Sequence, residues 1–275
     1  MDLSREDFEQ IRKVVKNRSG IWLSDAKLNF LKLRLAPRLR ETSMETARDY
    51  YYFLKYDSNG EKELDDLVDA VAVNETYFFR EEHQLKDFMQ GIIPQLSHVN
   101  KGMNPLSIWS AACSTGEEPY TLAMLLLEHA STIHPSKIRI LASDISQTAL
   151  HAAREGIYDN YSLRYLPESY RVKYFDETWD GRYAIKNRVK QLVNFGRINL
   201  MDSFAANRVK NMECIFCRNV LIYFDDVDKS RCINNLYQSL VSGGYLLLGH
   251  SESLARISDL FEIVRMNNSV LYKKP

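Results

Sequence analysis

Residues 108–120 read Ile-Trp-Ser-Ala-Ala-Cys-Ser-Thr-Gly-Glu-Glu-Pro-Tyr. The apolar run from Leu106 to Ala112 predicts a buried strand, and small residues follow it at 113–116. The acidic pair and the proline at 117–119 suit the first turn of a helix, because the helix dipole favours negative charge there and proline has no N–H to leave unpaired. The stretch therefore predicts a strand, a tight turn and a helix, the unit that opens a cofactor crevice in doubly wound α/β folds.

The turn at 113–116 favours a nucleoside-type ligand, because small side chains let a ligand approach the backbone closely. It contains a single glycine, Gly116, and so lacks the dinucleotide-binding pattern G-x-G-x-x-G. An ordinary strand-to-helix turn without a ligand is the alternative interpretation.

Length, charge balance and cysteine usage limit the class of protein. The chain has 275 residues and is 45% hydrophobic, enough for one large domain or for a small and a medium one. Lys plus Arg and Asp plus Glu number 36 each, which argues against nucleic-acid binding over a basic surface. No apolar run approaches about 18 residues, so we expect no membrane span. The N-terminus lacks a signal-peptide pattern and the four cysteines fit a reducing compartment, so we expect a cytoplasmic protein.

Residues 1–73 are expected to form a helical N-terminal domain. Apolar residues repeat at helical spacing from Phe8 to Val15 and again from Leu28 to Leu39. Pro37 lies in the second of these helices and should kink or end it.

Three cations, Lys27, Arg34 and Arg38, fall on a face beside the leucine stripe of the second helix. A solvated basic face is one interpretation of this pattern. The other is a docking surface for an acidic partner.

Residues 74–90 are expected to link the helical domain to the rest of the chain. Polar Asn74 and Thr76 precede three aromatic residues at 77–79, and Arg80 follows. In one interpretation the aromatic residues are core between domains and Arg80 is a surface charge. In the other, the segment covers the cofactor crevice and Arg80 points into it.

Residues 91–275 alternate strands with helices, which is typical of an α/β domain with a mainly parallel sheet. The strand predicted at 137–143 ends at Asp144, and the next helix begins at Ser146 or Gln147. Nucleoside-binding folds hold ribose hydroxyls with an acidic residue at this place. Capping of the following helix is the alternative role for Asp144.

Residues 156–190 interrupt the alternation with a tyrosine-rich, charged segment. Asp180-Gly181 within it is a hairpin signal, so we expect a small inserted antiparallel element. The last strands, at 261–264 and 269–273, are expected to pair antiparallel.

Polar residues follow further strands of the predicted sheet. Asn199 ends the strand at 191–198, and Asn219 and Tyr223 follow the strand at 212–217. Because ligands bind at the carboxyl edge of open α/β sheets, we expect these groups to converge on one crevice. The other polar groups expected there are Thr76, Arg80, Glu117 and Asp144.

Cys214-x-x-Cys217 invites a metal-site interpretation that we do not adopt. Residues three apart on a strand point to opposite faces, and a second C-x-x-C or H-x-x-H pair is absent from the sequence. We expect these cysteines to be buried small hydrophobic residues, and we predict no metal.

Five segments together resemble the chemotaxis receptor methyltransferase family, CheR. They are Asn74-Glu-Thr-Tyr-Phe-Phe-Arg80-Glu81, Trp109-Ser-Ala-Ala-Cys-Ser-Thr-Gly-Glu-Glu-Pro-Tyr120, Ala142-Ser-Asp144-Ile145, Phe216-Cys-Arg-Asn-Val-Leu-Ile-Tyr-Phe-Asp225 and Gly249-His-Ser-Glu-Ser-Leu254. They lie in the family's order, and the resemblance spans essentially the whole chain. It implies a Rossmann-like S-adenosylmethionine-dependent methyltransferase sheet with antiparallel edge strands, a small inserted β-subdomain at about 158–195 and an all-α N-terminal domain.

The resemblance further implies a protein-glutamate O-methyltransferase, with S-adenosylmethionine as methyl donor, S-adenosylhomocysteine as product and no metal. Its acceptors would be glutamates on the cytoplasmic helices of chemoreceptors. The residues carried over to the cofactor region are Asn74, Thr76, Arg80, Glu117, Asp144, Asn199, Leu200, Asn219 and Val220, with Glu118 as a competitor for the place of Glu117.

Two residues are expected at the point of methyl transfer. Arg80 would orient the acceptor carboxylate, and Tyr223 would donate a hydrogen bond nearby. The basic face of Lys27, Arg34 and Arg38 becomes a candidate dock for an acidic receptor helix.

The inserted β-subdomain binds a short receptor tail peptide in some members of the family. The turn from Asp176 to Arg182 is short here and has one glycine, Gly181, which argues against tail-peptide binding. Two alternatives to receptor methylation stay open: a methyltransferase of the same fold with a different acceptor, and a module that binds the methyl donor and signals without transfer.

Overall fold

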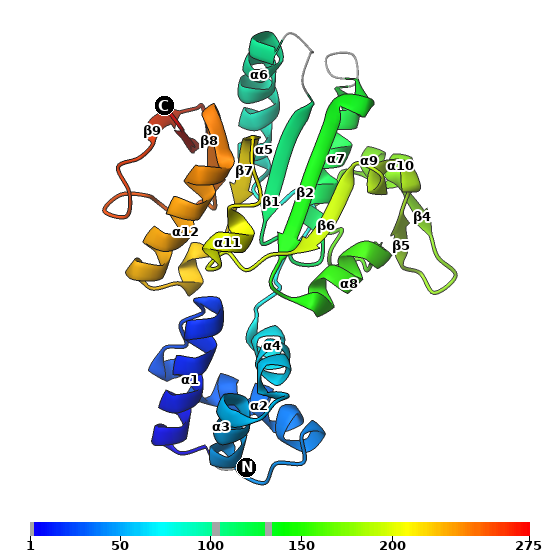
Figure 1. Ribbon diagram of the computed structural model, residues 1–275. Helices are drawn as coiled ribbons and strands as arrows, with labels where there is room; N and C mark the ends of the chain where they lie inside the picture. The colour runs from blue at the N-terminus through cyan, green and yellow to red at the C-terminus, as the bar shows by residue number, and fades with distance from the viewer. Residues whose placement is uncertain (1–2, 101–104, 130–133) are drawn as a thin grey trace. The chain divides into compact units, whose positions relative to one another are not determined.

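The computed structural model describes residues 3–100, 105–129 and 134–275, and the chain divides into two compact units (Figure 1). The helical unit comprises Met1–Val73 together with Ile222–Lys229. The sheet unit comprises Asn74–Leu221 and Ser230–Pro275. A short segment late in the sequence thus belongs to the helical unit.

The helical unit is built from α1 (Arg5–Ser19), α2 (Leu28–Glu41), α3 (Ala47–Tyr56) and α4 (Gly60–Val71), with a short 3₁₀ turn η1 (Asp25–Lys27) before α2. Ser4 caps α1 by accepting from the Asp7 amide at 3.1 Å. The two apolar stripes predicted from spacing, represented by Ile11 on α1 and Leu31 and Leu35 on α2, are fully buried in one core. Helices this short are marginally stable on their own in water. Packing their apolar stripes into one core stabilises them.

Pro37 does not end α2, which continues to Glu41. The expectation that the helix would end there is wrong. Proline removes the hydrogen bond to the carbonyl of Leu33, but both residues are exposed, so water can replace the lost donor.

The segment Ile222–Lys229 is held in the helical unit by side-chain and backbone contacts. The Trp22 amide donates to the Tyr223 carbonyl at 2.8 Å. The Lys16 ammonium pairs with Asp225 and, at 3.7 Å, with Asp228. Asp225 also caps α12 (Asp226–Ser239) by accepting from the Asp228 amide at 2.9 Å.

The sheet unit contains a seven-stranded sheet in the order β6-β2-β1-β7-β8-β10-β9. Its strands are β1 (Leu106–Ala111), β2 (Ile138–Asp144), β6 (Val193–Arg197), β7 (Met212–Cys217), β8 (Leu240–Leu248), β9 (Glu262–Arg265) and β10 (Val270–Lys273). The first five of these pair in parallel, and β10 pairs antiparallel with both β8 and β9. This confirms the predicted Rossmann-like sheet with antiparallel edge strands.

The topology places a switch point beside β1. The chain continues from β1 to β2 on one side, and β7 pairs with β1 on the other. Ile108 is in register with Ile140 of β2 and Cys214 of β7, and all three are fully buried. Open α/β sheets bind ligands outside the carboxyl ends of strands at such a point.

Helices follow most of the strands: α7 (Glu117–Glu128) after β1, α8 (Gln147–Glu155) after β2, the short α11 (Ser203–Ala206) after β6 and α12 after β7. Ser146 caps α8 by accepting from the Ala149 amide at 3.0 Å, as expected from the sequence.

Helical structure that the sequence reading did not anticipate precedes β1. The segment runs through α5 (Glu82–Asp87), a π-helical turn η2 (Phe88–Ile92) and α6 (Ile93–Asn100). Its apolar residues join the sheet core, and the Phe88 ring packs edge-on against Phe216 at 5.0 Å between centroids. A linker was expected over 74–90, but helix begins at Glu82.

A second, three-stranded antiparallel sheet has the order β3-β5-β4, with β3 (Ile157–Tyr158), β4 (Phe175–Glu177) and β5 (Tyr183–Ile185). The short helices α9 (Glu168–Tyr174) and α10 (Asn187–Lys190) flank it. Gly181, with φ of 76°, turns the hairpin between β4 and β5. The range of about 158–195 expected for the insert runs into β6, which belongs to the main sheet.

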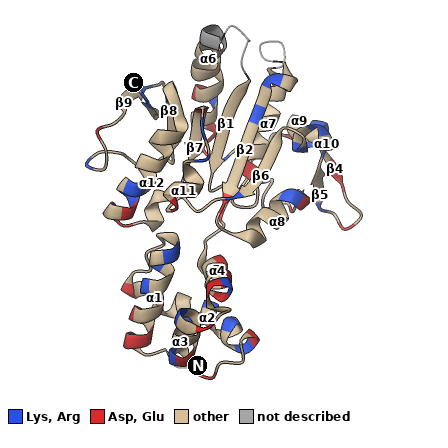
Figure 2. Ribbon diagram, viewed as in Figure 1, with Lys and Arg blue, Asp and Glu red and all other residues tan. Residues whose placement is uncertain are grey.

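Charged residues of both signs are mixed along the chain. Figure 2 shows Lys and Arg interspersed with Asp and Glu over both units. All four cysteines are buried free thiols. Among the described residues, no group of three or more His, Cys, Asp and Glu is placed to hold a metal ion. Within the same residues, no helix has the length and apolar character to cross a membrane.

Candidate active site

Backbone strain gathers around the carboxyl edge of the sheet. Five residues with side chains have positive φ in the segments that meet there: Phe79, Glu81, Ala112, Ser114 and Asn219. Each such residue costs roughly 1–3 kcal/mol and persists only where its surroundings fix it, which is typical of binding and catalytic sites. The strained positions belong to the segment before α5, the turn after β1 and the turn after β7.

Asp144 ends β2 and holds the turn after β1. Its two oxygens accept from the amides of Ser114 at 2.8 Å and Ser146 at 2.9 Å. The residue is 6% exposed. A carboxylate has about four acceptor positions and can accept hydrogen bonds from hydroxyl groups as well as from amides.

Glu117, the first residue of α7, is 2% exposed. It accepts from the Thr115 hydroxyl at 2.7 Å and from the Ser162 hydroxyl at 3.1 Å. Burial raises the pKa of Glu117, and the two hydroxyl donors oppose that rise only in part. A positively charged ligand group beside Glu117 would favour its ionised form.

Glu118 points to a different set of partners. Its Oε1 accepts from the Ser110 hydroxyl at 2.7 Å, and its Oε2 from Arg218 Nη1 at 3.1 Å. Burial raises the pKa of Glu118, with Arg218 acting in the opposite direction. Glu118 is therefore committed to an internal ion pair, whereas the side-chain donors to Glu117 among the described residues are neutral hydroxyls.

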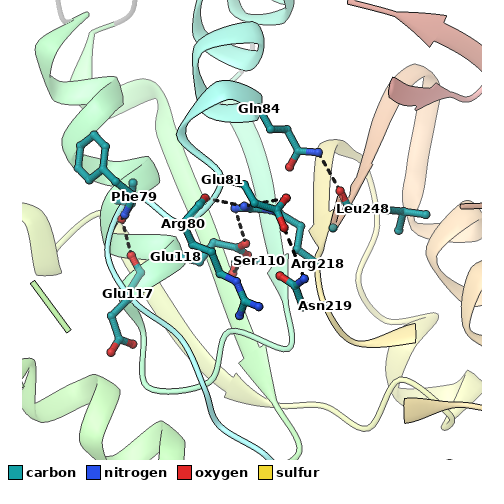
Figure 3. A network of polar contacts seen from close by, with 12 residues as sticks. Phe79, Arg80, Glu81, Gln84, Ser110, Glu117, Glu118, Arg218, Asn219 and Leu248 are labelled. Carbon is teal, nitrogen blue, oxygen red and sulfur yellow. Dashed lines mark hydrogen bonds and ion pairs between the residues drawn. The ribbon is translucent and has the colours of Figure 1, made fainter. Parts of the chain in front are cut away.

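Arg218 joins the segment before α5 to the end of β7 (Figure 3). Its side chain is 3% exposed and donates to the Arg80 carbonyl at 2.5 Å, to Glu118, and to Glu81 Oε2 at 3.2 Å. Burial alone would raise the pKa of Glu81, but Arg218 and the His250 amide together bring it below its usual value. The sequence analysis assigned Arg218 no role, because a position inside a motif does not show what its side chain contacts.

The Arg80 side chain has a different environment from that of Arg218. Its Nη1 donates to the Glu75 carbonyl at 2.8 Å, and its guanidinium lies 5.7 Å from the centre of the Tyr77 ring. Figure 3 shows it extending away from the ion pairs of Arg218. In the described part of the chain, Arg80 forms no ion pair with a carboxylate.

Glu252 organises the turn after β7. Its carboxylate accepts from three backbone amides, those of Asn219 at 2.7 Å, Val220 at 2.8 Å and Gly249 at 2.7 Å. A Cβ on Gly249 would lie 2.8 Å from the Asn219 amide nitrogen, so only glycine fits there. The Gly249–Leu254 segment was noted in the sequence, but this anchoring role was not inferred.

The remaining expected cofactor residues occupy the same unit. The Asn74 carbonyl accepts from the Ser114 hydroxyl at 3.1 Å, and Thr76 is half-buried. Asn199 Oδ1 accepts from the Met201 amide at 3.0 Å, which shapes the turn after β6. Leu200 is buried, and its carbonyl accepts from Asn235 at 2.8 Å.

Tyr223 and the basic face lie in the helical unit. Lys27 and Arg34 are exposed, and each lies 5.3 Å from the centre of the Phe30 ring. Arg38 is only 16% exposed and pairs with Glu41, Glu63 and Asp66. Arg38 therefore differs from the exposed cation expected on this face, because its guanidinium is used inside the helical unit.

Comparison with known proteins agrees with this architecture. Residues 74–270 match the family model described as CheR methyltransferase, SAM binding domain, and residues 6–72 match the CheR methyltransferase, all-alpha domain. Chemotaxis protein methyltransferase 2 of Vibrio cholerae is 38% identical over 269 residues, covering 98% of this chain and 93% of that protein.

Two further relatives give the same result. The chemotaxis protein methyltransferase of Borreliella burgdorferi is 36% identical over 258 residues, 92% of this chain and 90% of that protein. Chemotaxis protein methyltransferase 1 of Pseudomonas aeruginosa is 33% identical over 277 residues, 99% of each chain. With both of its units matched by the family's own models, this chain belongs to the CheR methyltransferase family.

Proposed function

We propose that the protein transfers a methyl group from S-adenosylmethionine to glutamate carboxylates on the cytoplasmic helices of chemoreceptors, forming glutamyl methyl esters and S-adenosylhomocysteine. Family membership and relatives named as chemotaxis protein methyltransferases support methyl transfer in chemotaxis. The observation that favours a carboxylate acceptor is Arg80, whose guanidinium forms no ion pair among the described residues although Arg218 close to it is paired twice.

The chemistry of the site fits S-adenosylmethionine, which supplies a methyl group on a positively charged sulfur when bound. Glu117 is a buried carboxylate without a cationic partner in the described residues, so a cationic ligand would offset its burial. Asp144 is a buried carboxylate at the end of β2, where it is proposed to accept from the ribose hydroxyls. Asn74, Thr76, Asn199, Leu200, Asn219 and Val220 complete the proposed cofactor surroundings.

The acceptor carboxylate has to be held in position, but no base is needed to remove a proton from it. A glutamate with a pKa of about 4.3 is already ionised at neutral pH, so its oxygen is nucleophilic without a base. Arg80 presents a planar fork of donors that matches a carboxylate and would hold it in line for attack. Tyr223 is proposed to donate a hydrogen bond near the transfer point. Exclusion of water and fixed orientation then supply the rate enhancement.

Receptor docking is proposed for the exposed cations Lys27 and Arg34 of the helical unit, which complement an acidic helix. Arg38 is left out of this surface because three carboxylates already surround it. Such a partner places the protein in the cytoplasm. The short turn from Thr178 to Arg182 continues to argue against capture of a receptor tail peptide.

Methyl transfer from radiolabelled S-adenosylmethionine to a chemoreceptor cytoplasmic fragment tests the proposal. We expect label on the receptor that base treatment releases as volatile methanol, because a carboxyl methyl ester is base-labile. Base-stable label would show a different acceptor. Absence of label from a protein that binds S-adenosylmethionine would favour a signalling module without transfer activity.

A further inference from the structure

A hollow of about 580 Å³ lies in the helical unit, away from every residue assigned a role above. It lies between α1, α3 and α4 and is lined by Gln10, Lys13, Val14, Asn17, Arg18, Tyr51, Lys55 and Leu64. Sites for small ligands usually measure about 300–1,000 Å³ and combine an apolar lining with a few polar groups. The volume of this hollow lies in that range, and Val14, Leu64 and the Tyr51 ring supply apolar surface among its polar side chains.

Two cations at the hollow lack a carboxylate partner. On α1, Arg5, Arg12, Lys16 and Arg18 all form ion pairs, and Lys13 is the exception among the described residues. Lys55 on α3 contacts the Tyr51 hydroxyl at 3.5 Å and pairs with no carboxylate in the described part of the chain. Both lysines are exposed, so the rim of the hollow carries unneutralised positive charge.

Gln10 contributes a buried polar atom that needs a partner. Its Oε1 is buried and accepts no hydrogen bond from any described residue. An unmade hydrogen bond at a buried acceptor costs about 1–3 kcal/mol, so rotation of the side chain toward a ligand in the hollow would relieve it. The turned amide presents an oxygen and a nitrogen, and the edge of a nucleobase offers partners for both.

We propose that this hollow binds a nucleotide. Its phosphates would lie against Lys13 and Lys55, its base would stack on the Tyr51 ring, and the polar edge of the base would bond with Gln10. Val14 and Leu64 supply the apolar surface beside the ring. Free phosphate would contact neither Tyr51 nor Gln10. An acidic peptide would bring no flat base to stack on the Tyr51 ring. The site is independent of receptor methylation.

Calorimetric titration of the full-length protein with GTP and GMP tests this assignment. Saturating S-adenosylhomocysteine is present throughout, so that the cofactor site cannot take up the nucleoside. We expect the double variant Lys13→Glu/Lys55→Glu to bind GTP at least about tenfold more weakly, since it loses two charge-assisted contacts to phosphate. The control Lys62→Glu reverses an exposed lysine of α4 outside the hollow and should bind as the wild type does.

The probes separate the possible ligand classes. Inorganic phosphate binding as tightly as GMP would overturn the nucleoside assignment, because base contacts would then contribute nothing. Saturation by an acidic peptide such as poly-glutamate in place of GTP would overturn it in favour of a protein partner. No GTP binding, or equal binding by the wild type and the double variant, would also overturn it. Weaker binding after Tyr51→Ala, with the fold retained by circular dichroism, would support it.

Discussion

Arg218 Nη1 donates to Glu118 Oε2 at 3.1 Å and joins the end of β7 to the first turn of α7. The side chains are 3% and 14% exposed, so the pair is shielded from solvent. Removing one partner of a buried pair leaves an uncompensated charge. We therefore expect Arg218→Met to lower the free energy of unfolding by about 3–5 kcal/mol, measured by chemical denaturation.

The control for Arg218→Met is the double variant Arg218→Met/Glu118→Gln. It removes the orphaned charge of Glu118 and leaves that of Glu81, and Gln keeps an acceptor for the Ser110 hydroxyl. Part of the lost stability should return. A double variant no more stable than Arg218→Met would show that the ion pair is not the source of the loss.

Glu117 predicts a pH-dependent stability. Burial raises the pKa of its carboxyl, so the folded state binds a proton before the unfolded chain does as pH falls toward 4.5. As pH falls through the raised pKa toward 4.5, the free energy of unfolding of the wild type should therefore rise relative to that of Glu117→Gln. At pH 7 Glu117→Gln should be more stable than the wild type. The difference between their free energies of unfolding should become smaller as the pH is lowered toward 5. Denaturation at both pH values measures it, and a constant difference would contradict the prediction.

The order of elements around the first strand was predictable because its signals are local. The apolar run, the small-residue turn and the acidic pair at 106–119 specify β1 and α7 without reference to distant contacts. The antiparallel strands β9 and β10 and the hairpin at Gly181 were predictable for the same reason.

Features that depend on long-range contacts were not predictable. Arg218 acquires its role from Glu81 and Glu118, and even the nearer of these lies 100 residues earlier. The contact of the Tyr223 carbonyl with the Trp22 amide joins residues far apart in the sequence, and no local pattern indicates it. The helical segment from Glu82 was missed because its aromatic and β-branched apolar residues also suit a strand or a linker.

Arg80→Ala should lower kcat/KM for receptor methylation by about 100-fold, because the acceptor carboxylate loses its orienting donors. Arg80→Lys keeps the charge but loses the planar fork, so it should recover only part of the activity. Arg171→Ala removes a half-buried arginine of α9 that pairs with Glu168, outside the proposed site, and serves as the control. Activity of Arg80→Ala within twofold of the wild type would remove Arg80 from the site.

Charge reversal on the docking surface should weaken receptor binding without affecting the cofactor. Lys27→Glu/Arg34→Glu is expected to raise KM for the receptor about tenfold while the Kd for S-adenosylmethionine stays unchanged. Added salt should raise the wild-type KM and leave that of the variant nearly constant, since exposed charges are screened. An unchanged KM would show that the receptor docks elsewhere. Lys62→Glu is again the matched control, being exposed on α4.

Arg38 should behave as a structural residue, in contrast to Lys27 and Arg34. Its guanidinium donates to both oxygens of Glu63, which is 8% exposed and also accepts from the Tyr50 hydroxyl. Arg38→Ala leaves that carboxylate buried without a cation and should lower the free energy of unfolding by about 3 kcal/mol. Lys27→Glu/Arg34→Glu should change it by about 0.5 kcal/mol or less, because both side chains are exposed. Thermal and chemical denaturation of the two variants side by side distinguishes the roles. Equal stability of the two would return Arg38 to the docking surface.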